Sequence, residues 1–349
     1  MKTYKLKIIT LAFGAVFLSS CTNLLFTSLD VLRPAKVAFA PEASNLLIVN
    51  NTIVQPPEIG HTSRLLNEMP RNILVSSDSL SIFCLGALKE DLESKNFFGS
   101  VQISPKSVNP ENNFSIVNQL SSEKITDLCK TYQSDVVISL DKITVNDEIS
   151  EYYLNESSTY LATLEVRCET FWSVHYPNKT AYIPLQFKDT VYWESESYSR
   201  RKTISELPKR DDALIDAALN VGQKSVNRFV PYWEKVDRYF YNPDNKLMKQ
   251  GMDSVYVKNW KSAILIWEKA LNKSKSVWIQ AQAANNIAIS YEILGDIEKA
   301  LEYATHSYYS LGKLNFVDLD SFVRTSEYIS ELTQRKKDIS LLKKQLGEN

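Results

Sequence analysis

The sequence predicts an α+β protein: a mixed sheet with packed helices and a β-meander, followed by an all-α helical-repeat domain. Apolar residues recur at both strand and helix spacings from Pro34 to about Tyr241, with one long stretch of strict two-residue alternation. The remaining tail shows only helical spacing, with one pattern that occurs twice. A chain of 349 residues is long enough for two domains. We therefore expect an α+β domain at residues 34–241 and a helical domain at residues 242–349.

Short apolar runs in the first half predict strands, and three- and four-residue spacings predict helices. The expected strands are Lys36–Ala40, Leu46–Asn51, Ser100–Ile103 and Asp135–Leu140. The expected helices are Ser79–Ser94 and a segment that begins at Ser121 or Ser122, where a serine can cap the first turn. The last of these strands is apolar enough to lie at the centre of a sheet.

The alternating stretch predicts the meander. From Leu164 to Val174 apolar residues alternate with polar ones, so one face of this strand is expected to be buried and the other wet. A turn at Pro177–Lys179 leads into a return strand through Ala181–Phe187, and Thr190–Trp193 extends the meander. Helical spacing then returns over Asp211–Val230 and stops at Pro231.

This order of elements resembles a small α/β domain of several envelope lipoproteins. The matching residues are the strand ending at Pro41, the helix Phe83–Leu92, Phe98–Val101 and the passage Ser134–Val137. The domain occurs in the Tol system's translocation lipoprotein partner, in the curli secretion-channel lipoprotein and in outer-membrane activators of penicillin-binding proteins. The whole arrangement also looks like a family of uncharacterised lipoproteins common in Bacteroidetes, which implies architecture and little chemistry.

The start of the chain predicts export. Lys2, Lys5 and Lys7 precede the apolar run Ile8–Leu18, which suits a secretory signal and is too short to span a bilayer. The following Ser19-Ser20-Cys21 resembles the bacterial lipoprotein cleavage box. This resemblance implies a signal peptide at residues 1–20, acylation of Cys21 with palmitate-like chains, and a lipidated tether at residues 21–33. The alternative is an ordinary signal peptide with a chance cysteine.

Two features that are missing after the cleavage box bear on the membrane in which the protein is anchored. Thr22 is not the aspartate that retains many lipoproteins at the inner membrane, and no acidic cluster follows Cys21. By resemblance to known sorting rules, we expect an outer-membrane lipoprotein that faces the periplasm.

The tail resembles tetratricopeptide repeats. Ala263–Ala270 and Ala300–Ser307 share a spacing of small and bulky residues 37 residues apart, and Asn286–Asp296 matches the first helix and turn of a repeat. The period is about three residues longer than usual. Helices after Asp320 are expected to supply a third layer, with docking onto the first domain as the alternative. Such stacks form concave surfaces for partners. The aromatic residues expected to contact an envelope protein there are Trp267, Trp278, Tyr291, Tyr308 and Tyr309, with ordinary packing as the alternative.

Composition and motifs argue against several functions. The whole chain has 40 basic and 41 acidic residues, and removal of the signal leaves 37 against 41. The densest basic groups, Arg200–Lys202 and Arg335–Lys337, are short, so we expect no nucleic-acid binding. The three histidines are isolated, and we find no glycine-rich phosphate loop or nucleophile elbow. We therefore expect no enzyme, no cofactor and no metal site. Cys84, Cys129 and Cys168 are expected to be free buried thiols, with a Cys84–Cys129 bridge as the alternative.

Together these features predict a membrane-anchored periplasmic lipoprotein that acts as a protein-binding adaptor or scaffold in cell-envelope assembly or maintenance. One alternative is a homo-oligomer that forms part of a secretion channel, as the curli-channel resemblance implies. The other is a protein that binds cell-wall glycan through aromatic residues of the meander such as Trp172 or Trp193.

Overall fold

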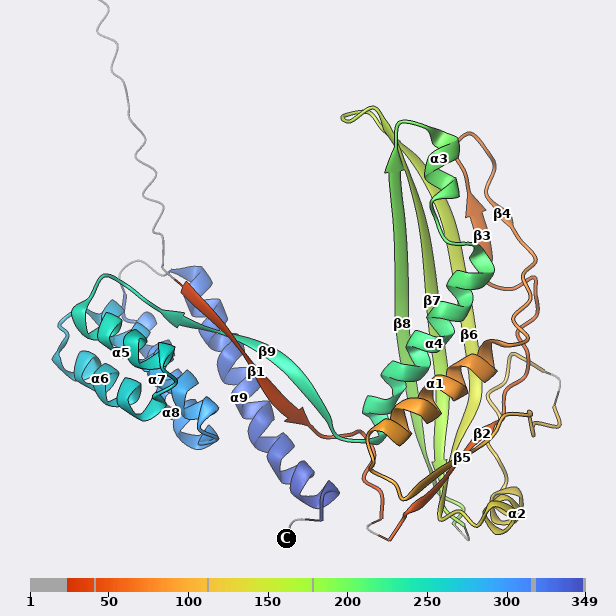
Figure 1. The fold of residues 1–349 in the computed structure, drawn as a ribbon, viewed down its shortest axis with the longest axis horizontal. Helices are drawn as coiled ribbons and strands as arrows, with labels where there is room; N and C mark the ends of the chain where they lie inside the picture. Colours follow the sequence, from red (N-terminus) through yellow and green to blue (C-terminus); the bar gives the residue numbers. More distant parts are fainter. Residues whose placement is uncertain (1–23, 41, 112, 178, 315–317, 348–349) are drawn as a thin grey trace, which may run out of the picture. The chain divides into compact units, whose positions relative to one another are not determined.

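The computed structural model describes residues 24–347 except 41, 112, 178 and 315–317. The fold is α+β, with a sheet in the first half of the chain and helices in the second (Figure 1). The chain forms two compact units. The sheet unit comprises Leu32–Trp233 and the last residues from Ile339. The helical unit comprises Glu234–Asp338 together with the first strand as far as Val31. The expected signal peptide and Cys21 lie outside the described residues.

The sheet unit contains one mixed sheet. In the described part of the chain its strands are β2 (Asn45–Asn50), β3 (His61–Arg64), β4 (Arg71–Asn72), β5 (Ser100–Ser104), β6 (Val136–Leu154), β7 (Thr159–His175) and β8 (Tyr182–Ser197).

The long strand β6 organises this sheet. Its first residues pair in parallel with β2, Leu46 opposite Val136, and its later residues pair in parallel with β3, His61 opposite Asp147. Along its other edge β6 pairs antiparallel with β7, with one irregularity between Leu140 and Lys142, and β7 pairs antiparallel with β8. The parallel strand β5 continues from β2, and the short β4 pairs antiparallel with β3.

Two helices cover one face of the sheet, α1 (Leu80–Ser94) and α4 (Arg210–Phe229) (Figure 1). Their apolar sides join the sheet in a core that includes Leu88, Val221 and Trp172. The two helices approach closely because residue 222 is glycine: a Cβ atom there would collide with the backbone carbonyl of Cys84.

The opposite face is covered only in part. Helix α2 (Ser122–Tyr132) packs against β2 and β6 through Ile125 and Leu128, and its N-cap Ser121 accepts a hydrogen bond from the Lys124 backbone. The short helix α3 (Arg200–Ser205) follows β8. Along β8 intermediate and exposed residues alternate, as expected for a strand with one wet face.

The helical unit contains α5 (Lys246–Tyr256), α6 (Trp260–Lys273), α7 (Val277–Ile293), α8 (Ile297–Leu311), α9 (Leu319–Gln345), and the paired strands β1 (Leu24–Arg33) and β9 (Tyr232–Tyr241). Polar side chains cap the first turns: Asn245, Asn259, Ser276 and Asp296 each accept a backbone hydrogen bond. Met248, Trp267, Ile287 and Leu332 lie in the core of this unit.

The structure departs from several expectations. Lys36–Ala40 forms no strand. Leu24–Arg33, expected to be a tether, is strand β1, because it can pair with β9 and bury alternate residues such as Val31. The expected boundary at residue 241 also differs from the division between Trp233 and Glu234, since β9 packs with the helices that follow it. Pro184 lies within β8, where a residue without an N–H is tolerated because β8 pairs with β7 on one side only.

Candidate partner-binding site

Strand β9 is held between α7 and α9 in the helical unit. The side chain of Asn286 on α7 accepts a hydrogen bond from the Tyr241 backbone N–H and donates one to the Tyr241 carbonyl, both 2.8 Å long. Asn285 Nδ2 donates to the Tyr239 carbonyl at 3.2 Å. Both asparagines are fully buried. Helix α7 therefore binds the main chain of an extended strand through two adjacent amides.

A buried charge cluster fixes the same strand. Arg238 on β9 donates from Nε and Nη2 to the two carboxylate oxygens of Glu292 on α7, at 2.8 and 3.0 Å. Tyr328 and Arg335 on α9 also donate to Glu292, at 2.9 and 2.6 Å. Burial, followed by the charge of Glu292, holds the pKa of Tyr328 well above its usual range, so its hydroxyl remains a donor.

Strand β9 also contacts α9 directly through polar side chains. Tyr241 Oη donates to Ser321 Oγ at 2.9 Å, and the Arg238 guanidinium lies over the Tyr328 ring at 5.0 Å. On its edge β9 pairs with β1, and the two strands run in opposite directions (Figure 1). The chain thus places its own strand between α7 and α9.

The five aromatic residues that the sequence singled out have different environments. Trp267 is a core residue, with no exposed surface: Gly251 packs directly on its indole, whose Nε1 donates to the Met248 carbonyl at 3.2 Å. The expectation that Trp267 contacts a partner is therefore wrong. Tyr291 is half-buried and stacks on Tyr303, with ring centroids 5.6 Å apart. Trp278 is also half-buried and packs against Tyr241 of β9.

Tyr308 and Tyr309 come together with the start of α9. The Tyr308 ring lies 4.3 Å from that of Phe322 and 5.8 Å from that of Tyr309. Tyr309 is 65% exposed, Leu319 is 66% exposed and Val323 is 44% exposed. Leu319, Phe322 and Val323 have the i, i+3, i+4 spacing that places them on one side of a helix. We call Tyr308, Tyr309, Leu319, Phe322 and Val323 the aromatic patch.

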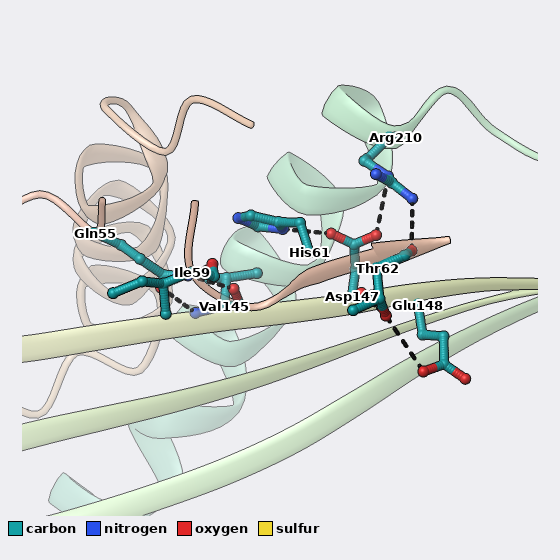
Figure 2. A network of polar contacts seen from close by, with 8 residues as sticks. All are labelled: Gln55, Ile59, His61, Thr62, Val145, Asp147, Glu148 and Arg210. Carbon is teal, nitrogen blue, oxygen red and sulfur yellow. Dashed lines mark hydrogen bonds and ion pairs between the residues drawn. The ribbon is translucent and has the colours of Figure 1, made fainter. Parts of the chain in front are cut away.

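A buried polar network in the sheet unit includes a histidine. His61 Nδ1 lies 2.5 Å from Asp147 Oδ1, and Arg210 Nε lies 2.9 Å from Asp147 Oδ2 in an ion pair whose angle falls short of a hydrogen bond. Figure 2 shows Asp147 between the other two side chains. Arg210 Nη2 also donates to the Thr62 carbonyl at 3.0 Å. The network ties β3 to β6 and to the first turn of α4.

Gln55 adds further hydrogen bonds to β6 next to this network (Figure 2). Its Nε2 donates to the carbonyls of Ile59 and Val145, at 2.7 and 2.8 Å, and its Oε1 accepts from the Val145 N–H at 2.8 Å. These bonds hold the irregular segment before β3 against β6. We infer a structural role for Gln55 and Arg210.

A serine, a histidine and an aspartate meet on β6 and β7, in an order unlike that of a hydrolase. Ser139 Oγ donates to Asp141 Oδ1 at 2.7 Å and lies 3.1 Å from His175 Nε2, so the serine lies between the other two. In a nucleophilic triad the histidine occupies the middle position. Burial lowers the pKa of His175 to about 4 and raises that of Asp141. The arrangement suits a structural chain from neutral His175 through Ser139 to Asp141.

The cysteines, the metal-ligating residue types and Trp172 were also considered from the sequence. Cys84, Cys129 and Cys168 are free and buried, as expected. Within the described residues no group of three or more His, Cys, Asp or Glu side chains is arranged to hold a metal ion, and no helix is long and apolar enough to cross a membrane. Trp172 is buried against Phe229, so it cannot contact a glycan.

Sequence reasoning missed the residues that hold β9, which are Arg238, Asn285, Asn286 and Glu292. Adjacent asparagines and a glutamate in an otherwise apolar helix were the available signal, because buried polar side chains need partners. Their partner lies about 45 residues earlier in the chain, so spacing alone could not identify it.

Comparisons with known proteins place the chain among uncharacterised families. A family described as Domain of unknown function (DUF8603) matches residues 43–241, and a second, Domain of unknown function (DUF6340), matches residues 249–334. No curated protein matches.

Two solved structures each share 12% sequence identity with this chain. One is a putative neuraminyllactose-binding hemagglutinin homolog from Helicobacter pylori, with 64% of this chain and 96% of that chain covered and a TM-score of 0.26. The other is rare lipoprotein B from Shewanella oneidensis, with 56% and 96% covered and a TM-score of 0.21. Scores this low carry no argument about function.

Proposed function

Because the chain belongs to the family of DUF8603, whose name assigns no activity, we propose its function from its own residues. We propose that it is a lipoprotein, acylated at Cys21 and facing the periplasm from the outer membrane, that acts as an adaptor in cell-envelope assembly or maintenance. The helical unit, whose hairpins α5–α6 and α7–α8 we interpret as tetratricopeptide-like repeats, would present the surface for a protein partner.

The aromatic patch is the observation that supports this proposal. Tyr309, Leu319 and Val323 expose large apolar side chains beside the packed rings of Tyr308 and Phe322. Tyrosine is enriched among the residues that dominate binding energy at protein interfaces, and clustered apolar exposure is typical of such sites. The strand β9 already occupies the space between α7 and α9, so the patch is the better candidate.

The anchor and the patch would act together. More than one acyl chain confines a protein stably to its membrane, and confinement raises the effective concentration of its surface for neighbouring proteins. An adaptor can therefore work with a modest intrinsic affinity. The chain needs no catalytic group for this role.

Capture in intact cells tests the adaptor proposal. Affinity-tagged chain would be crosslinked and purified, and its partners identified by mass spectrometry, for wild type and for Tyr309→Ser with Val323→Ser. The matched control is Tyr256→Ser with Val257→Ser, which removes a tyrosine and a valine that are 61% and 74% exposed at the end of α5. We expect the patch variant to lose one specific partner and the control to keep it.

Four outcomes would count against the proposal or a part of it. Equal capture by the patch variant would remove the aromatic patch from it. Recovery of the chain alone, in one oligomer of fixed size, would favour the self-assembling alternative. Persistence of Cys21→Ser in the membrane fraction would overturn the lipid anchor. Retention on cell-wall material would instead favour the glycan-binding alternative.

A further inference from the structure

A cavity of about 140 Å³ lies in the helical unit between β9, α7 and α9. Its wall is formed by residues of all three elements. They are Asp237, Arg238 and Tyr239 from β9, Asn285 and Ile289 from α7, and Arg324, Glu327, Tyr328 and Glu331 from α9. The volume is many times the minimum needed for one water molecule. Three polar groups in its wall lack hydrogen-bond partners, and these groups indicate what it can bind.

Arg324 shares the cavity wall with the carboxylate residues Asp237, Glu327 and Glu331, and one of its donors is left over. Its Nη2 donates to Ser321 Oγ at 3.2 Å, but its Nε is buried and has no hydrogen-bond partner. No ion pair joins Arg324 to a carboxylate among the described residues. The neighbouring Arg238, by contrast, pairs with both Glu292 and Glu331. A guanidinium at a cavity wall, with a donor left over, favours an anionic acceptor because charge-assisted hydrogen bonds to carboxylates are strong.

Tyr239 adds a second donor beside Arg324. Its hydroxyl is buried without a hydrogen-bond partner, and the Arg324 guanidinium lies 5.3 Å from its ring centre. Burial, followed by the neighbouring Tyr241, raises the pKa of Tyr239, so the hydroxyl keeps its proton near neutral pH. It can therefore donate to the same anion.

Asn285 supplies an acceptor. Its Nδ2 donates to the Tyr239 carbonyl at 3.2 Å, and this bond fixes which amide atom is the oxygen. The Oδ1 atom is left buried without a partner in a side chain that has no exposed surface. An unpaired buried acceptor is costly, so a ligand with an N–H donor would be favoured here.

We propose that this cavity binds a carboxylate that lies next to an N–H group: an α-amino acid, either free or as the last residue of a peptide chain. The carboxylate accepts from Arg324 Nε and Tyr239 Oη, and the N–H donates to Asn285 Oδ1. The site does not depend on the aromatic patch, and it stands or falls separately from the adaptor proposal.

Isothermal titration calorimetry on the full chain in detergent tests the proposal with three probes. N-acetylglycine represents a chain end, glycine represents a free amino acid, and N-acetylglycinamide keeps the N–H but lacks the carboxylate. We expect saturable binding of one or both carboxylate probes, and no binding of N-acetylglycinamide. Tighter binding of N-acetylglycine identifies a chain end as the source, and tighter binding of glycine identifies the free amino acid.

Variants assign the binding to the cavity. Arg324→Gln is expected to lower the affinity for the carboxylate probe by roughly tenfold or more, since it removes a charge-assisted hydrogen bond. Tyr239→Phe removes only a hydroxyl and keeps the ring, so it should weaken binding while the protein stays folded. Lys336→Gln removes a charge from an exposed part of α9 and should bind as wild type does.

The proposal would be overturned by unchanged affinity in both Arg324→Gln and Tyr239→Phe, by equal binding of N-acetylglycinamide, or by failure of both carboxylate probes to bind. If Arg324→Gln does not fold, as judged by its thermal transition, Tyr239→Phe decides the result alone.

Discussion

Glu292→Gln should destabilise the helical unit more than any other single change of charge that we consider. The Glu292 side chain has no exposed surface and accepts from Arg238, Tyr328 and Arg335. A glutamine there loses the charge and turns an N–H₂ group toward these donors. Removal of one partner from a buried ion pair costs about 3–5 kcal/mol. Glu331 still pairs with Arg238, so we expect a value near 3 kcal/mol.

A double-mutant cycle tests whether this cost comes from the pair itself. Arg238→Met leaves Glu292 buried but still bonded to Arg335 and Tyr328, so it should cost about 2 kcal/mol. Because the double variant leaves neither charge unpaired, its cost should fall about 2 kcal/mol below the sum of the single costs.

The assay must report on one unit at a time, because a chain with two units need not unfold in a single step. Native-state hydrogen exchange of amides in α7 and α9, read by mass spectrometry, gives the stability of the helical unit. Amides of β6 and β7 serve as the internal reference. Glu298→Gln is the matched control: Glu298 pairs with Lys336 at the surface, and its loss should change stability by no more than about 0.5 kcal/mol. A Glu292→Gln effect no larger than that of the control, or strictly additive costs in the cycle, would refute the claim that this charge cluster holds β9 in place.

Three further predictions concern the sheet unit. Gly222→Ala should destabilise it by about 1–3 kcal/mol in urea titrations, because the new methyl group meets the Cys84 carbonyl. The control Gly86→Ala has open space around the new methyl group, so it should be neutral or stabilising by up to about 1 kcal/mol. Equal effects of the two variants would contradict the close approach of α1 and α4. The pKa of His175 is about 4 in the fold against 6.5 in the unfolded chain, so its contribution to stability is present above pH 6.5 and is lost as the pH falls toward 4. The raised pKa of Asp141 acts in the opposite sense, so a variant is needed to isolate the effect of His175. The urea midpoint should therefore be compared between wild type and His175→Gln at pH 7 and pH 4.5. The same pH dependence of the midpoint in both proteins would exclude His175 as the source of that dependence. Cys84 and Cys168 are buried, with pKa values raised by burial, so a thiol reagent at pH 8 should label them only after denaturant is added, and rapid labelling of the native protein would contradict their burial.

The sequence was most informative where one local pattern determines an element. The capped helix after Ser121, the amphipathic helix over Leu80–Ser94 and the alternating strand around Leu164–Val174 each bury a face that their own spacing defines. The α+β class followed from these elements. The helical tail was predicted for the same reason.

The errors came from partners distant in sequence. Leu24–Arg33 has the alternation of a strand, but only its pairing with β9, some 200 residues later, makes it one. Trp267 was assigned to a surface because aromatic residues suit interfaces, yet it fills the space that Gly251 leaves in the core. Arg238 and Arg324 look alike in the sequence. Only the fold shows that both line one cavity, and that Arg238 has two carboxylate partners while the Nε of Arg324 has no hydrogen-bond partner.

The central claim is that the aromatic patch contacts a protein partner in the cell envelope, and a photo-crosslinking residue at position 309 tests it most directly. The same residue at position 256, where Tyr256 is 61% exposed against 65% for Tyr309, provides the control. Irradiation of intact cells should yield one discrete crosslinked protein from position 309 and none of the same mass from position 256. The same product from both positions, or no product from position 309, would contradict the claim.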